Sequence, residues 1–204
     1  LNDLLFFLER LGGSLVDTAA DPPALSFEDP ATLDALVAYA ALSTEYGVKP
    51  VYLTDLSDMA GASAMYLERQ ALVDGGRAAM WTSSTALAVP GTGSARDFTV
   101  GAAPLPIKQG SEGTGTYTGA GRGLPARRAV AESDAYREQV GAERAAAYLA
   151  SVAGFDRPSS FQALSQDDWL GVGILWLGRA YGQIVDGEAT AEEALAAAQD
   201  LADD

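Results

Sequence analysis

An aromatic residue and a run of hydroxyl side chains follow a glycine-rich turn in the middle of the chain. Trp81 is followed within four residues by Ser83, Ser84 and Thr85, and a glycine pair lies in the preceding segment, 72–80. An indole can lie flat against a sugar ring and donate one hydrogen bond, while hydroxyls both donate and accept. These residue types at this spacing suit the non-covalent binding of a sugar or polyol.

Two further side chains complete the candidate binding set. Trp169 follows a pair of aspartates at the start of a predicted helix, where it could reach a cleft, and Arg127 could face an anionic ligand. Each candidate also has an ordinary structural use. Serines and threonines are common caps and turn formers, Trp81 could be a core residue, and Arg127 could be solvated. Trp176, two turns into the helix, is expected in the core.

The chain contains no histidine and no cysteine. Ser-His triads, cysteine nucleophiles and zinc sites with histidine or cysteine ligands are therefore excluded, and we expect no catalytic residue, metal or cofactor. Carboxylates at Asp55, Asp58, Glu68 and Asp74 leave a glycoside hydrolase as an alternative, because such enzymes use two carboxyl groups. Nothing in their spacing places two of them together, which favours a binding protein over an enzyme.

Charge and length narrow the class of protein further. Thirteen basic and 28 acidic residues give a net charge of −15, which repels phosphate backbones and anionic lipids and disfavours nucleic-acid partners. The 204 residues suffice for one well-packed domain over residues 1–204. No apolar run approaches the roughly 18 residues of a membrane span. The chain begins at Leu1 without a signal peptide, so a secreted origin would imply a leader that has been removed.

The apolar periodicity predicts helices interrupted by short strands. Helices are expected over residues 4–11, 30–46, 63–74, 133–152 with a break at Gly141, 168–184 and 191–201. Extended segments are expected at 15–16, 24–27, 78–80 and 98–106. Inward-facing residues on these helices are expected to include Leu33, Leu36, Val37, Ala40, Leu67, Ala71, Leu72, Leu195, Ala198 and Leu201.

Local signals define several helix ends and one connector. Asp29-Pro30 predicts a capped helix start, and Thr190 with Glu193 predicts a capping box. The helix over 168–184 carries four glycines, and each costs about 1 kcal/mol relative to alanine. Their number indicates close packing by a neighbouring segment. Residues 109–123 are rich in glycine and threonine, which is typical of a connector rather than a packed element.

Five segments carry a family resemblance in a consistent order. They are the glycine-paired segment 11–17, the Asp-Pro unit 26–30 with its helix, the turn–strand–loop–strand order of 72–106, the Gly-Leu-Pro-Ala-Arg segment 123–127 and the C-terminal segment 186–195. Together they resemble the second lobe of the extracellular solute-binding proteins of ABC importers, in the family that carries sugars and glycerol phosphates.

The resemblance implies an α/β fold: a helix-rich single lobe of the type II periplasmic-binding-protein kind, with a small central sheet flanked by helices. Family members have a first lobe that is missing here, and the connector 109–123 stands where the family makes an excursion into it. Such proteins bind a small-molecule sugar or polyol between two lobes and present it to ABC permease membrane subunits. An extracellular, periplasmic or lipid-anchored location is implied, and a lone lobe should bind its ligand weakly.

The resemblance also bears on the ligand. In the glycerol-phosphate-binding members a Ser-Ser pair contacts the ligand, and Ser83-Ser84 match it. An arginine that helps to hold glycerol phosphate in some relatives is replaced by Ile174, with Arg179 out of register, which favours a neutral sugar. A different class stays open: an acidic helical interaction module that docks partners on the helix 168–184. A homodimer through the exposed lobe surface is a further possible partner arrangement.

Overall fold

The structure, a computed structural model, describes residues 2–49, 67–68, 70–81, 98, 100–103, 128–152, 164 and 168–203. Contacts within the chain divide it into two compact units. Unit 1 comprises Leu1–Ala62, Ile107–Thr114 and Arg157–Asp204, and unit 2 comprises Ser63–Pro106 and Gly115–Asp156. The predicted connector 109–123 lies outside the described residues, and the single-domain organisation stays a prediction.

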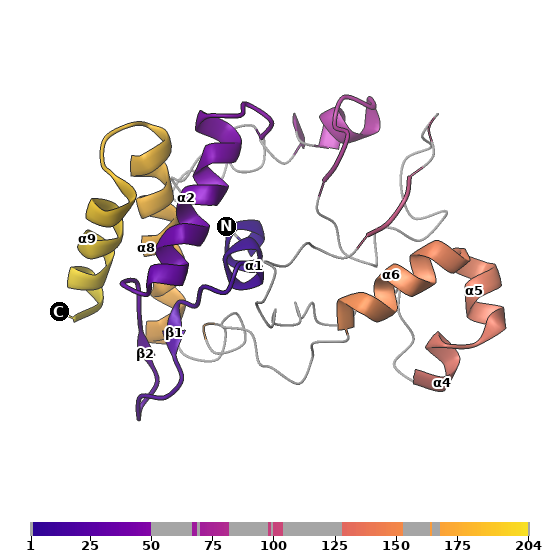
Figure 1. Cartoon of the computed structure of the whole chain (residues 1–204), viewed down its shortest axis with the longest axis horizontal. Helices are drawn as coiled ribbons and strands as arrows, with labels where there is room; N and C mark the ends of the chain where they lie inside the picture. The colour runs from indigo at the N-terminus through magenta and orange to yellow at the C-terminus, as the bar shows by residue number, and fades with distance from the viewer. Residues whose placement is uncertain are drawn as a thin grey trace. The chain divides into compact units, whose positions relative to one another are not determined.

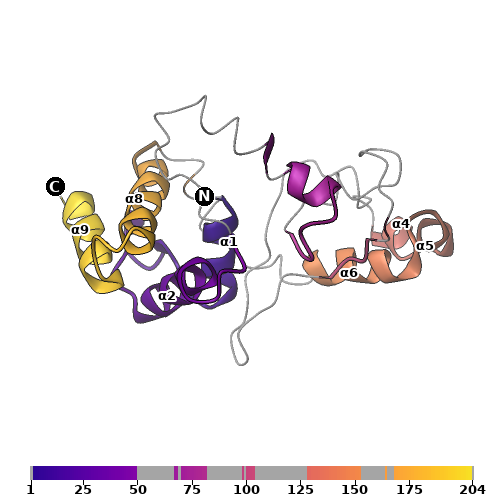
Figure 2. The ribbon, with the colours of Figure 1, turned by 90° about the horizontal axis from the view of Figure 1, so that it is seen from above.

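Four helices and a small sheet form the described part of unit 1. The helices are α1 (Asn2–Arg10), α2 (Pro30–Thr44), α8 (Asp168–Val185) and α9 (Ala191–Asp203). Helix α8 packs along α9, α1 packs against α2, and α2 also contacts α8 and α9 (Figures 1 and 2). Segments from the two ends of the chain therefore build one core.

The sheet of unit 1 is an antiparallel pair, β1 (Val16–Asp17) and β2 (Ala24–Leu25). Val16 pairs with Leu25, and Asp17 pairs with Ala24. Strand β1 overlaps the extended segment predicted at 15–16 and runs one residue beyond it, and β2 lies within the segment predicted at 24–27. The side chain of Leu25 is buried and approaches α8, so this small sheet closes one side of the core.

Helix α2 begins and ends as its sequence signals indicate. The Asp29 carboxylate accepts a hydrogen bond from the Ala31 N–H at 3.1 Å, with Pro30 as the first helical residue. Gly47, at φ +59°, lies in the turn that follows the helix. The prediction of the inner face of α2 was only partly right. Leu36 and Ala40 are buried as predicted, but Val37 is 47% exposed and Tyr39 is buried instead.

A close backbone crossing joins α2 to the segment after α1. Thr32 is fully buried, and its hydroxyl donates to the Ser14 carbonyl at 2.9 Å and accepts from the Ser14 N–H at 3.0 Å. A Cβ at Gly13 would lie 2.9 Å from the Thr32 Cα, closer than side chains tolerate. Gly13 therefore permits the approach that satisfies the buried hydroxyl.

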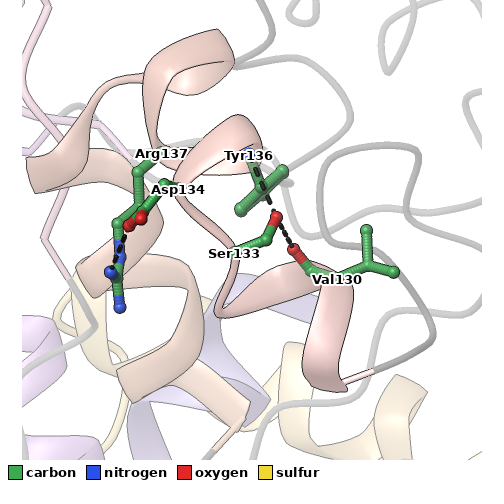
Figure 3. A network of polar contacts seen from close by, with 5 residues as sticks. All are labelled: Val130, Ser133, Asp134, Tyr136 and Arg137. Carbon is green, nitrogen blue, oxygen red and sulfur yellow. Dashed lines mark hydrogen bonds and ion pairs between the residues drawn. The ribbon is translucent and has the colours of Figure 1, made fainter.

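Unit 2 also contains helices, among them α4 (Arg128–Ala131), α5 (Asp134–Val140) and α6 (Ala142–Val152). The Ser133 hydroxyl accepts from the Tyr136 N–H and donates to the Val130 carbonyl, so one side chain joins the end of α4 to the start of α5 (Figure 3). Gly141, at φ +90°, separates α5 from α6. The predicted break at Gly141 is confirmed.

The strand predicted at 78–80 is wrong. Residues 70–74 are helical, and residues 75–81 then form a turn and irregular backbone, with Met80 90% exposed. Phe98 and residues 100–103, where a second strand was predicted, are also irregular. Leu67 is exposed rather than inward-facing. A short apolar run does not by itself establish a strand.

Across the described residues the protein is therefore helix-rich, with a small two-stranded sheet, as the sequence predicts in outline. None of the helices in this part of the chain is long and apolar enough to cross a membrane.

Candidate functional site

Two of the predicted binding residues can be located in the structure. Trp81 belongs to unit 2 and is partly buried at the end of the irregular segment 75–81. Trp169 belongs to unit 1, where it is the second residue of α8 and 51% exposed. Ser83, Ser84, Thr85 and Arg127 lie outside the described residues. The candidate site in unit 1 lies around Trp169 and its ring partner.

Trp169 is half of an aromatic pair. Its ring lies edge-on to Trp176 at a centroid distance of 5.5 Å and an interplanar angle of 80°. The ring of Phe27, which is fully buried, lies on the core side of Trp176, with a distance of 6.4 Å between the two ring centroids. Edge-to-face pairs of this kind are favourable by about 0.5–1.5 kcal/mol beyond their burial. Trp176 is thus held between a core ring and an exposed ring.

A groove lies between α8 and α9, and of the two paired rings Trp176 lines it whereas Trp169 does not. Trp176, Arg179 and Gln183 line it from α8, Leu201 lines it from α9, and four alanines complete the lining. Its volume is about 230 Å³, below the roughly 300–1,000 Å³ of pockets that enclose drug-sized ligands. A groove of this size suits a single small ring rather than an extended ligand.

Helical spacing explains why these side chains share a face. Trp169, Trp176 and Gln183 are seven residues apart, which returns them to the same side of α8, and Arg179 follows Trp176 by three residues. Leu177, about 100° round the helix from Trp176, is turned into the core and fully buried. The helix therefore presents one aromatic and polar stripe outward.

The second wall of the groove depends on where α9 begins. The Thr190 N–H and hydroxyl donate to the Glu193 carboxylate at 2.9 and 3.0 Å, and the Thr190 hydroxyl accepts from the Glu193 N–H at 3.2 Å. This is the reciprocal capping box that the sequence predicts. Because it sets the helix start, it places Ala194, Ala198 and Leu201 toward α8. Leu201, predicted to face inward, is 38% exposed at the groove.

The groove offers the chemistry of non-covalent recognition. An indole provides an apolar face, the guanidinium provides several fixed donors, and the Gln183 amide provides both a donor and an acceptor. Together these groups can contact an apolar ring face and exchange hydrogen bonds with polar groups on the same ligand. Over the part of the chain that the structure describes, no cluster of three carboxylates is positioned to hold a metal ion.

Sequence reasoning missed most of this site. Trp176 was expected in the core, and it does pack against the core while also lining the groove, whereas Arg179 was considered only as a phosphate ligand out of register. The seven-residue spacing of Trp169, Trp176 and Gln183 is the signal that could have identified the stripe. The spacing does not, however, indicate which helix packs beside the stripe, because that depends on the tertiary structure.

Comparison with known proteins adds no relative. The chain matches no family model, no curated protein and no solved structure.

Proposed function

We propose that this protein binds a small neutral carbohydrate without transforming it, as the second lobe of an ABC-importer solute-binding protein. The observation that carries the binding proposal is the ring pair of exposed Trp169 and partly buried Trp176, with Arg179 and Gln183 on the same face of α8. A single ring could stack on an indole while its hydroxyls bond to the guanidinium and the amide. The absence of histidine and cysteine from the whole sequence agrees with a function that needs no covalent chemistry.

The transport context rests on the sequence resemblance. Its C-terminal segment, 186–195, leads through the capping box into α9, which forms one wall of the groove. Its Asp-Pro segment, 26–30, begins α2 and includes Phe27, which supports Trp176 from the core. Two segments that carry the resemblance therefore help to build the candidate site. The finer fold proposal, a lobe of the type II periplasmic-binding-protein kind, rests on the same segments.

The proposal is tested by titrating the protein with glucose, maltose, glycerol and glycerol 3-phosphate. Ligand-observed saturation-transfer NMR detects weak complexes, and we expect millimolar affinity for a neutral sugar, because the groove contacts only one side of a ring. Glycerol 3-phosphate should bind no better than glycerol. Fluorescence in a Trp81→Phe background would follow the same titration, since Trp169 and Trp176 would be the remaining tryptophans.

Matched variants connect binding to the groove. Trp169→Ala should weaken sugar binding roughly fivefold, as expected from the loss of about 1 kcal/mol of aromatic contact. Leu175→Ala is the control, because Leu175 is similarly exposed on α8 but neither lines the groove nor belongs to the ring pair that Trp169 forms with the groove residue Trp176. Sugar binding that survives both Trp169→Ala and Arg179→Ala would contradict the assignment, as would the absence of any neutral-sugar binding.

One observation favours a second candidate function. Trp169, Leu175 and Leu201 are exposed apolar residues on α8 and α9, in a chain whose net charge is −15. An apolar surface on an acidic protein suits docking of a basic amphipathic helix. This candidate predicts that Leu175→Ala, which should not affect sugar binding, weakens binding of such a peptide.

A further inference from the structure

A positively charged side chain lies against two tyrosine rings in unit 1. The Lys49 Nζ is 4.5 Å from the ring centroid of Tyr39 and 4.9 Å from that of Tyr181. It also donates a hydrogen bond to the Tyr181 hydroxyl at 2.8 Å. A cation within about 6 Å of a ring centroid is attracted by the negative face of the ring. The Lys49 ammonium therefore lies over the Tyr39 ring and beside the hydroxyl end of the Tyr181 ring, and these two contacts define a small cation site.

The two rings are held in place by groups other than Lys49. Tyr39 comes from α2 and Tyr181 from α8, and their centroids are 5.5 Å apart at an interplanar angle of 58°. Phe7 contacts Tyr39 at 5.0 Å, and the Ser43 hydroxyl lies 3.3 Å from the Tyr181 hydroxyl. Both tyrosines are more than nine-tenths buried. The site is thus formed by core packing and should persist when Lys49 leaves.

Lys49 reaches the site on an exposed turn. The N–H groups of Val48 and Lys49 donate to the Leu42 carbonyl, and Gly47 has the positive φ that the turn requires. Val48 is 73% exposed, and nothing lies within 4 Å of a Cβ built at Gly47. Lys49 itself is only partly buried. The Lys49 side chain therefore reaches the two rings from an exposed turn.

We propose that the Tyr39–Tyr181 pair is a binding site for a methylated ammonium ion, and that Lys49 fills this site in the absence of such a ligand. Aromatic faces recognise methylated ammonium groups, whereas a lysine ammonium is strongly hydrated and gives up more water on entering the site. The net charge of −15 raises the local concentration of cations at the surface. The site is separate from the α8–α9 groove and does not depend on the carbohydrate proposal.

The first test removes the internal competitor. Tetramethylammonium chloride is titrated into the wild type, K49A and K49M, with binding measured by calorimetry at constant ionic strength. If Lys49 occupies the site for about nine-tenths of the time, only about one-tenth of the site is free, so K49A should bind about tenfold more tightly than the wild type. K49M is the matched control, because its uncharged side chain is of similar length and still covers the rings. Equal affinity of K49A and the wild type would overturn the proposal.

The second test assigns the binding to the rings. In the K49A background, Tyr39→Phe keeps an aromatic face and should retain tetramethylammonium binding, whereas Tyr39→Leu should abolish it. Binding that is indifferent to Tyr39→Leu would place the cation elsewhere and overturn the assignment.

A measurement on the unaltered protein stands even if a variant fails to fold. Tetramethylammonium that displaces Lys49 should increase its acylation by an amine-specific reagent, as quantified by peptide mass spectrometry. Sodium chloride at the same concentration is the control, and Lys108, the second of the two lysines in the chain, is the internal reference. An unchanged ratio of Lys49 to Lys108 labelling at saturating ligand would refute displacement.

Discussion

The Gln199 side-chain carbonyl accepts a hydrogen bond of 2.8 Å from the backbone N–H of Phe27, although the two residues are 172 positions apart. Phe27 directly follows the strand pair, and its fully buried ring contacts Trp176. Gln199 therefore ties α9 to the residue that supports the groove from beneath. The bond joins the two ends of the chain at the candidate site.

Replacing Gln199 with alanine should destabilise unit 1 and disturb the groove. The Phe27 N–H would lose its acceptor, and an unpaired buried donor costs about 1–3 kcal/mol. Urea unfolding followed by tryptophan fluorescence would measure the loss. Asp203→Ala is the control, because it removes only the second, exposed bond of Gln199, at 2.9 Å. Equal stability of Q199A and D203A would show that the bond to Phe27 contributes nothing.

Gly173 should tolerate no side chain while Leu25 is present. A Cβ at this position would lie 2.5 Å from the Leu25 Cδ2, and overpacking of this kind costs about 1–3 kcal/mol. Because Leu25 is buried, its methyl group has little room to move away, and a cost in the upper part of this range outweighs the gain of about 1 kcal/mol expected from replacing a helical glycine with alanine. Thermal unfolding should therefore show G173A to be less stable than the wild type.

The L25A background separates the clash with Leu25 from the effect of alanine on helix stability. There the space opposite Gly173 is vacant, so adding G173A should be neutral or stabilising. A loss of similar size in both backgrounds would mean that Leu25 is not the cause.

Tyr148 should be replaceable by phenylalanine with a gain in stability. Its hydroxyl is buried and has no hydrogen-bond partner among the described residues, which costs about 1–3 kcal/mol. Burial also raises the pKa of Tyr148 above its usual value, near 10. The unfolded chain therefore loses this proton first, and stability declines as the pH rises above about 10.

Hydrogen exchange of the amides in α5 and α6 would follow this part of the chain. Y148F should slow exchange at neutral pH and extend protection to higher pH. Burial, and then the neighbouring Tyr148, raise the pKa of Tyr136 as well, so some alkaline sensitivity should remain. Faster exchange in Y148F at neutral pH would indicate that the hydroxyl is satisfied in solution.

The α9 capping box should make the helix start sensitive to acid. Hydrogen bonds from the Thr190 backbone N–H and then its hydroxyl lower the pKa of Glu193 below the usual glutamate value. A lowered pKa in the folded state contributes stability above the unfolded value, near 4.3, and this contribution is lost as the pH falls through the folded value.

Glu193→Gln keeps an acceptor for Thr190 but does not titrate. Melting temperatures from pH 7 to pH 2 should show the wild type losing more stability than E193Q below about pH 4.3. Parallel curves over this range would rule out titration of Glu193 as a source of acid sensitivity.

Local signals predicted the helix ends well because their causes are local. Asp29 with Pro30, Thr190 with Glu193, and Gly141 act over one turn of chain, and each behaves in the structure as the sequence indicates. The four glycines of α8 predicted close packing without naming the neighbour, and Leu25 against Gly173 supplies one.

Predictions of burial were less successful because they depend on distant residues. The 3.6-residue period could not decide between Val37 and Tyr39 on α2. That choice depends on Phe7 and Tyr181, which provide aromatic partners for Tyr39. The strand predicted at 78–80 failed for a related reason: a strand needs a partner, and the apolar residues there have none among the described segments.

The sequence alone determined the helix-rich composition, the capped starts of α2 and α9, the break at Gly141 and the absence of histidine and cysteine chemistry. These follow from side-chain chemistry and from interactions within a few residues. Only the tertiary structure decided that Gln199 accepts a hydrogen bond from Phe27, that α9 forms one wall of the groove beside Trp176, and that Lys49 contacts Tyr39 and Tyr181. Each of these contacts joins residues whose separation along the chain carries no local signal, so it exists only once the core has brought them together.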